Sequence, residues 1–203
     1  MIKLSLSGVV VAALVCAAAS APAFAASPRE IPKSFLKYEH KEAQDKVFTW
    51  KVSDKAQPLA LLTDCPGKRP SVGKAEDTRT VTASGDSDYR YVEQLIIMPS
   101  PEAAQQVVKG TWAGAAACNT KKLAVKTPPI AYLGDEAFTF SAQDITKDSL
   151  GGAERAVVVR KGSSLLVYSQ STAYGKVGKH DFGKLLADAR AMVPRLCQAA
   201  KEC

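Results

Sequence analysis

The chain has 203 residues, and its 27 Lys and Arg against 20 Asp and Glu give a formal net charge of +7. The basic residues are spread in short doublets, without a basic block interleaved by aromatic residues, which argues against a nucleic-acid-binding protein. Beyond the N-terminal region no segment reaches the about 18 continuous apolar residues of a membrane-spanning helix, so we expect no transmembrane segment in the mature chain.

The first residues of the chain have the layout of a secretory signal peptide over 1–25. Lys3 supplies positive charge, residues 9–19 form a short apolar run, and residues 23–25 read Ala-Phe-Ala, with small residues at the two positions that a signal peptidase recognises. We therefore expect cleavage near Ala25 and a secreted mature chain. Lipid anchoring at Cys16 is the alternative, and the residues before this cysteine match a lipoprotein signal less well.

The mature chain divides into an N-terminal arm and one domain. Residues 26–54 are largely polar and rich in Lys and Glu, which predicts a loose arm with a strand candidate at 47–52. Residues 55–203 are expected to form a single domain. A mature chain of this length can bury a core without help from a metal.

The first half of the domain contains strand patterns followed by one helix. The segment 59–65 is apolar and ends at Cys-Pro-Gly, a turn signal. Residues 78–83 alternate and carry β-branched side chains, and residues 89–98 place apolar side chains on one face, interrupted by Glu93. A serine N-cap followed by a proline then begins a helix over 100–118.

The second half of the domain returns to strands and ends in a helix. Residues 121–130 form a proline-containing connector. Three strand-like runs follow it, at 137–142, 155–160 and 164–170. Apolar residues then repeat at helical spacing over 182–196, with Asp181 as the expected N-cap and Pro194 as an expected kink or restart. These patterns predict one α+β domain, an antiparallel β-sheet of about five to six strands packed with two main helices.

Four cysteines remain in the mature chain, which in an exported protein implies two disulfides. The preferred pairing joins Cys65 to Cys118, which would clip the first helix to the sheet, and Cys197 to Cys203, which would close a short C-terminal loop. The second bond requires the chain to leave the helix after Cys197, because a straight helix separates residues six apart by about 9 Å. The rival pairing joins Cys65 or Cys118 to Cys203.

The sequence contains no pattern that points to catalysis, a metal or a cofactor. The two histidines, His40 and His180, have no second metal ligand at helical spacing. The nucleophile elbow G-x-S-x-G and the phosphate-binding glycine motifs are absent. Asp135 and Glu136 are adjacent at the entrance of a strand, where alternation points them to opposite faces, so we do not expect them to act as an acid–base pair. We predict no catalytic residues, no metal site and no cofactor.

A binding role would belong to polar side chains near the open end of the predicted sheet. The candidates are Asp135, Glu136, Arg155, Arg160 and Tyr168. The two arginines could hold an anionic group, and the carboxylates could contact a cationic group of a ligand. A tyrosine hydroxyl at the edge of a strand prefers water or a hydrogen-bond partner, which makes it suitable for a groove.

The order of the motifs resembles a known family, the PknH-like extracellular sensor domains and related secreted or lipid-anchored actinobacterial proteins. The resemblance rests on a strand ending in Cys65, a W-x5-C pattern in the first helix, LGDEAFTF at 133–140, ERAVVVRKGSSLLVYSQ at 154–170 and a final helix with Cys197. It implies an antiparallel sheet with helices, two disulfides and a cleft for an unidentified ligand, without catalytic residues. Because this chain has no kinase domain, we expect any sensing to need a partner.

Together these observations predict a secreted, non-catalytic, sensor-like binding domain associated with the cell envelope. The expected partner is an unidentified small molecule or an anionic component of the envelope. The alternatives are a secreted hydrolase with a non-obvious active site, and an extracellular inhibitor or adhesion module that acts through an exposed surface.

Overall fold

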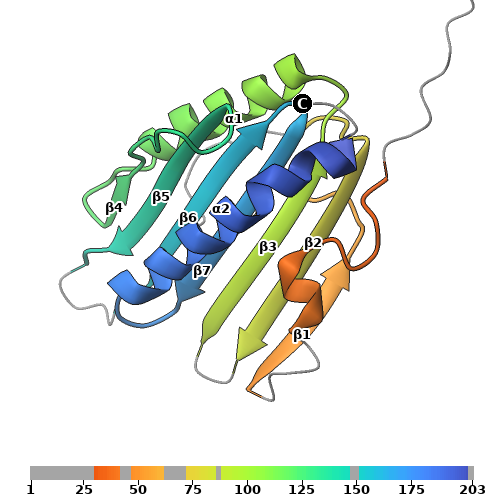
Figure 1. The fold of residues 1–203 in the computed structure, drawn as a ribbon. Coiled ribbons are helices and arrows are strands. Elements are labelled where there is room, and N and C mark those ends of the chain that lie inside the picture. The colour runs from red at the N-terminus through yellow and green to blue at the C-terminus, as the bar shows by residue number, and fades with distance from the viewer. Residues whose placement is uncertain (1–29, 42–46, 62–71, 86–87, 147–150, 201–203) are drawn as a thin grey trace, which may run out of the picture.

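The computed structural model describes residues 30–41, 47–61, 72–85, 88–146 and 151–200. In these residues seven strands form one sheet, with helices packed on both of its faces (Figure 1). The strands, in chain order, are β1 (Phe48–Ser53), β2 (Asp77–Gly85), β3 (Tyr89–Ile97), β4 (Leu123–Lys126), β5 (Glu136–Asp144), β6 (Ala153–Lys161) and β7 (Ser164–Thr172). The helices are η1 (Lys37–His40), α1 (Pro101–Ala116) and α2 (Lys179–Ala200).

The order of strands across the sheet is β1-β2-β3-β7-β6-β5-β4, and all neighbours are antiparallel. The predicted α+β class and antiparallel sheet are therefore confirmed. The described strands number seven rather than five to six. The prediction missed β4, whose four residues lie inside the expected connector 121–130 and are too few to show an alternating pattern. In the predicted strand 59–65, the described residues 59–61 lie outside the sheet.

The central strands β6 and β7 are buried on both faces. Val157 and Val159 contact the core on the α2 side, whereas Ala156 and Val158 contact the core on the α1 side. Because successive side chains point to opposite faces, a strand covered on both sides has to be apolar at each of these positions. This explains the continuous apolar run that the sequence shows in β6.

Strand β5, next to the edge strand β4, alternates between apolar and polar side chains over residues 138–143. Phe138 and Phe140 are buried against the α1 side, on the shared face that the sequence predicted. The polar residues Thr139, Ser141 and Gln143 lie on the opposite face and are only half-buried. Helix α2 packs on β6 and β7 and leaves this polar row of β5 partly open.

The two main helices begin by different means. Ser100 caps α1 as predicted, its Oγ accepting a hydrogen bond from the Ala103 amide at 3.2 Å, and Pro101 takes the first helical position. Helix α2 starts at Lys179, two residues before the expected N-cap, so Asp181 lies in its first turn. Pro194 lies inside one continuous helix, and the expected restart there does not occur.

The described part of the predicted arm packs into the α2-side core instead of lying loosely. Ile31, Phe35, Leu36 and Tyr38 are at most 5% exposed and belong to the same apolar cluster as α2. The ring of Tyr38 meets Trp50 of β1 at 5.8 Å. Apolar residues in a short irregular turn can be buried without a periodic pattern. Because the surrounding residues are polar, the sequence contained no indication that this segment contributes to the core.

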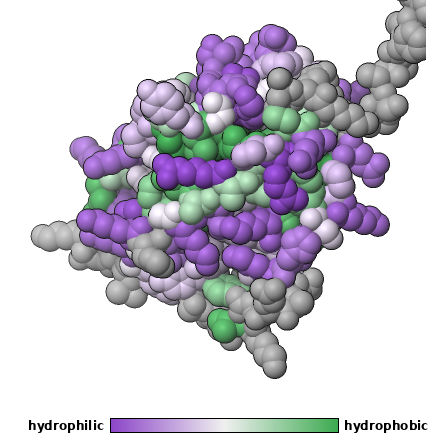
Figure 2. All heavy atoms as spheres, in the orientation of Figure 1, coloured by the Kyte–Doolittle hydropathy of each residue, from purple (hydrophilic) through white to green (hydrophobic). Residues whose placement is uncertain are grey.

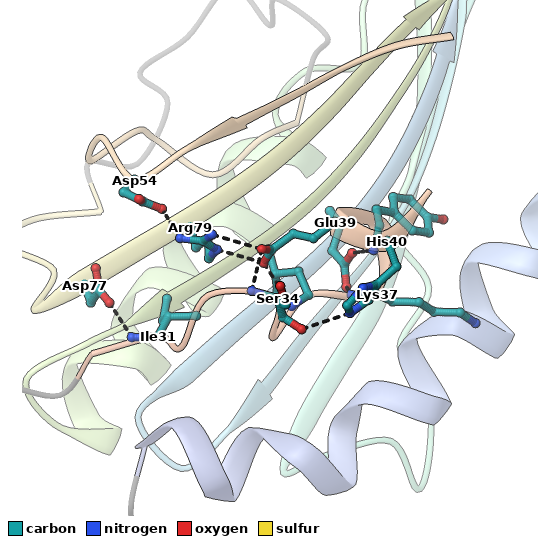
Figure 3. A network of polar contacts seen from close by, with 11 residues as sticks. Ile31, Ser34, Lys37, Glu39, His40, Asp54, Asp77 and Arg79 are labelled. Atoms are coloured by element: carbon teal, nitrogen blue, oxygen red, sulfur yellow. Dashed lines mark hydrogen bonds and ion pairs between the residues drawn. The ribbon is translucent and has the colours of Figure 1, made fainter. Parts of the chain in front are cut away.

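An ion pair fixes this segment to β2 (Figure 3). The guanidinium of Arg79 donates to both carboxylate oxygens of Glu39, at 2.7 and 2.9 Å, and also to Asp54 at 2.5 Å. The same Glu39 carboxylate accepts the backbone amides of Ser34 and Leu36. Burial acts to raise the pKa of Glu39, but the guanidinium and the two amides outweigh it and leave the pKa lowered. Glu39 therefore stays charged and holds the turn closed.

The structure describes two of the cysteines expected to pair. Cys118 follows α1 and is buried in the same cluster as Leu59, and Cys197 lies within α2. Cys65 and Cys203 lie outside the described residues, so the structure tests neither of the predicted bonds. The pairing therefore stays a prediction.

We expect Arg79→Met to destabilise the fold by about 3–5 kcal/mol, because it leaves the Glu39 carboxylate, only 6% exposed, without its partner. Urea unfolding of the variant and the parent measures the loss. Adding Glu39→Gln should recover part of the stability, since the uncompensated charge is then gone. Arg90→Met, at an exposed position of β3, is the matched control and should cost less than about 1 kcal/mol. Equal losses in the two arginine variants would contradict the role of the pair.

Candidate functional site

The predicted acid pair meets Arg160 at the start of β5. Glu136 pairs with Arg160 across β5 and β6, and the guanidinium lies 3.5 Å from the Glu136 carboxylate and 3.2 Å from that of Asp135. Asp135 also accepts the Gly162 amide at 2.7 Å and the Lys161 ammonium at 2.9 Å. The two acids, Asp135 and Glu136, therefore hold the β6–β7 hairpin against the start of β5.

The backbone at this corner leaves little freedom. Gly134 has a φ of +67°, and a Cβ there would lie 2.4 Å from the Arg160 carbonyl oxygen, so only glycine fits. Burial acts to raise the pKa of Asp135, but the Gly162 amide and the Lys161 and Arg160 charges leave it lowered. An acid held in its charged form by these contacts is a poor proton donor at neutral pH. The arrangement supports the interpretation of the acid pair as the entrance of a strand.

The two candidate arginines are not brought together. Arg155 and Arg160 are five residues apart on β6, which separates them by about 17 Å and points them to opposite faces of the sheet. The guanidinium of Arg155 lies 5.5 Å from the ring centre of Phe182 in α2. The two side chains therefore cannot hold one anionic group between them, as the sequence had suggested.

Tyr168 also differs from its expected place at a groove. It lies in the middle of β7, a central strand, and its side chain has no exposed surface. Its hydroxyl donates a hydrogen bond to the carboxylate of Glu93 on β3. Tyr168 is a core residue that satisfies a buried carboxylate.

Glu93 is the centre of a buried polar network that the sequence analysis did not identify. Its carboxylate accepts the backbone amides of Lys37 and Tyr38, at 3.0 and 2.5 Å, as well as the Tyr168 hydroxyl. The Tyr38 hydroxyl in turn donates to Asp188 of α2 at 2.8 Å, and Lys37 forms an ion pair with the same carboxylate. In the sequence, the only sign of this network is that Glu93 interrupts the apolar face of β3.

The carboxylates and tyrosines of the network are buried, whereas the Lys37 side chain reaches the surface. Glu93 is 0% exposed and Tyr38 is 1% exposed. Burial raises the pKa of Glu93 to about 7, although the Tyr168 hydroxyl and the two backbone amides act to lower it. Burial, together with the neighbouring carboxylates, raises the pKa of both tyrosines. No substrate could reach these groups, so the network serves the fold rather than a reaction.

The open polar feature on the α2 side is a recess of about 520 Å³, which we call the α2 recess. It lies between the β4–β5 edge of the sheet and the chain that enters α2. Its charged and amide lining consists of Lys126, Gln143, Glu154, Arg155, Lys176 and Lys179. Figure 2 shows the face that carries α2, where hydrophilic side chains surround smaller hydrophobic areas. The volume lies in the range of small-molecule sites, about 300–1,000 Å³.

A second depression of about 380 Å³ has a different character. It is lined by the acids Asp88, Asp144 and Glu154 together with Arg90. Mixed charges of this kind compensate one another. The α2 recess is the more suitable of the two for a charged ligand.

Within the described residues, no group of three or more His, Cys, Asp and Glu side chains could hold a metal ion. In the same part of the chain, no helix has the length and apolar character needed to cross a membrane. His40 contacts the backbone oxygen of Ser34 at 3.0 Å, which accounts for that histidine as a partner of the turn before η1.

No model of a known protein family matches the chain, and no curated protein matches it in sequence. Solved structures do match its fold. The crystal structure of the extracellular domain of PknH from Mycobacterium tuberculosis matches with a TM-score of 0.55 and 10% identity, over 80% of this chain and 94% of that one. An uncharacterised protein from Mycobacterium smegmatis matches with a TM-score of 0.45 and 12% identity, over 75% and 92% of the two chains. The first match shows that this chain has the fold of the PknH extracellular domain.

The raised pKa of Glu93 predicts a pH-dependent stability. Because the folded state binds the proton more tightly, the free energy of unfolding should fall as the pH rises from 4.5 to about 7, by about 3 kcal/mol, and change little above that. Urea unfolding across this pH range, in the parent and in Glu93→Gln, measures the difference.

The glutamine variant should lack this component of the slope, because an amide does not titrate. Glu30→Gln, at an exposed position, is the control and should keep the slope of the parent. If Glu93→Gln and the parent show the same slope, Glu93 does not titrate in this range.

Proposed function

We propose that this chain acts outside the cytoplasm as a non-catalytic, sensor-like domain that binds a small molecule or an anionic component of the cell envelope. The observation that carries the proposal is the α2 recess. Its described lining offers four cations, one carboxylate, a serine and an amide, and it includes no histidine or cysteine. Such a recess is suited to binding rather than to bond cleavage.

The fold supports the same proposal. The PknH structure that it matches is an extracellular domain, and the match covers most of both chains. The N-terminal sequence has the layout of a secretory signal peptide, and lipid anchoring at Cys16 is the secondary proposal. Both would place the domain at the cell envelope.

Of the predicted ligand-binding residues, Arg155 is the one that lines the recess. Asp135, Glu136 and Arg160 contact one another at a different corner of the sheet, and Tyr168 is buried. We therefore retain a direct binding role for Arg155. The remaining four residues contribute to the shape of the domain.

Two disulfides, Cys65 to Cys118 and Cys197 to Cys203, complete the proposal for an exported domain. Leu59 and Val72 flank the undescribed segment that contains Cys65, and both pack in the same cluster as Cys118. Leu59 and Val72 therefore lie on the side of the sheet where Cys118 is found. The C-terminal bond would need Cys203 to fold back after Ala200, where α2 ends.

Peptide mass spectrometry without reduction should find the Cys65 peptide linked to the Cys118 peptide. Replacing Cys118 by serine should then reduce the stability of the oxidised protein by about 4 kcal/mol, because the bond closes a long loop. Alkylation of all four thiols in the untreated, exported protein would refute this pairing and weaken the proposal of export.

The binding function is tested by thermal unfolding of the mature chain with soluble cell-wall fragments and dispersed lipids. A ligand at about 100 times its Kd should stabilise the protein by about 2.7 kcal/mol and raise Tm by several degrees. Chromogenic ester, glycoside and peptide substrates serve as the catalytic comparison, and none should turn over. The proposal would be overturned if the folded protein, but not the unfolded protein, turned over one of these substrates. It would also be overturned if none of the probes changed Tm.

A further inference from the structure

We propose that the α2 recess binds a phosphate-bearing polar group, held by Lys126, Arg155, Lys176 and Lys179. This inference rests on the proposed function, because it names the chemistry and the place of the binding. Four cations and a single carboxylate, Glu154, are the charged residues of the described lining.

The carboxylate does not neutralise the recess. Alternation along β6 places Glu154 on the α1 face with Ala156 and Val158, away from α2. A second acid beside the recess is Asp181, in the first turn of α2, whose carboxylate oxygen lies 3.0 Å from the position that a Cβ on the lining residue Gly178 would occupy. Even with both acids counted, four cations leave the recess positive.

Some cations of this domain are already engaged by carboxylates. Arg79, Arg160, Lys37 and Lys161 each form an ion pair with a carboxylate. The three recess lysines are Lys126, Lys176 and Lys179. Within the described residues, none of them forms an ion pair. Where cations outnumber the acids around a hollow, they concentrate a positive potential there, which attracts an anion.

The recess is also held in shape. Arg155 is half-buried, and its guanidinium lies over Phe182, which limits the rotation of the side chain. The Gln143 amide donates to the carbonyl oxygens of Gly152 and Gly175, each at 3.4 Å, and Val177 is only 2% exposed. These contacts fix both ends of the loop that carries Lys176. A site whose donors are already oriented loses less entropy when a ligand binds.

The chemistry of these donors favours phosphate. A guanidinium presents a planar fork that matches two phosphate oxygens, and ammonium groups add point charges around it. Helix α2 begins at Lys179, on the rim of the recess, and the partial positive charge of its first turn acts in the same direction. The volume of about 520 Å³ suits a phosphorylated headgroup rather than a long polymer.

The test uses the mature chain and two probes, glycerol 3-phosphate in solution and vesicles of phosphatidylglycerol in phosphatidylcholine. The recess variant is K126Q/K176Q/K179Q, and the control is K51Q/K55Q/K109Q, which changes the net charge equally at exposed lysines elsewhere. Binding is followed by NMR shifts for the soluble probe and by co-sedimentation for the vesicles. Thermal unfolding confirms that both variants fold.

We expect saturable shifts at the Arg155 side chain and at the amides of residues 176–179. The recess variant should bind at least about tenfold more weakly, and the control should change less than twofold. Binding of glycerol 3-phosphate would identify a free phosphate ester as a sufficient ligand, and binding to vesicles alone would identify a headgroup within a lipid surface. Either result supports the inference.

Equal weakening in the recess variant and the control would overturn the inference, because net charge alone would then explain the binding. Shifts confined to another surface would also overturn it. If neither phosphate probe binds but an uncharged envelope fragment raises Tm, this inference fails while the proposed function stands. If no probe of any class binds, both fail.

Discussion

The burial of one carboxylate, that of Glu93, is the constraint on which the α2 face of this molecule depends. A buried acid is unfavourable unless its oxygens accept hydrogen bonds. Here the donors come from η1 and from β7. A second carboxylate, Asp188 of α2, is satisfied by Tyr38 and Lys37 of the same short segment. The polar network therefore fixes the N-terminal segment, the sheet and α2 relative to one another.

This arrangement also decides where the domain can bind. Because α2 packs over β6 and β7, and the N-terminal segment covers the neighbouring part of the same face, the polar row of β5 remains at the margin. The apolar side chains of β5, Phe138 and Phe140, are used on the other face. The α2 recess forms where the covering helix begins, beside a strand whose exposed side chains are polar. Its position thus follows from packing, whereas its charge follows from the residues that happen to meet there.

Several elements were predictable because their signals are local. The serine cap and the apolar spacing identified α1, and the alternation of β5 identified its buried face, since both depend on residues close together in the chain. The short strand β4 and the packing of Ile31 to Tyr38 were missed, because four residues or an irregular turn carry no period. Of the candidate binding residues, Arg155 lies at the recess, but its expected partner Arg160 lies on the opposite face. That separation followed from alternation along one strand and could have been predicted.

The sequence by itself determined the α+β class, the antiparallel sheet, the two main helices and the order of motifs that resembles a sensor domain. Periodicity and turn chemistry are properties of neighbouring residues, so they can be interpreted without a structure. Only the tertiary structure decided that Glu39 meets Arg79, that Glu93 meets the backbone of η1, and that cations from three separate segments surround one recess. Those contacts depend on strand register and on how helices lie across the sheet, and a linear pattern contains neither.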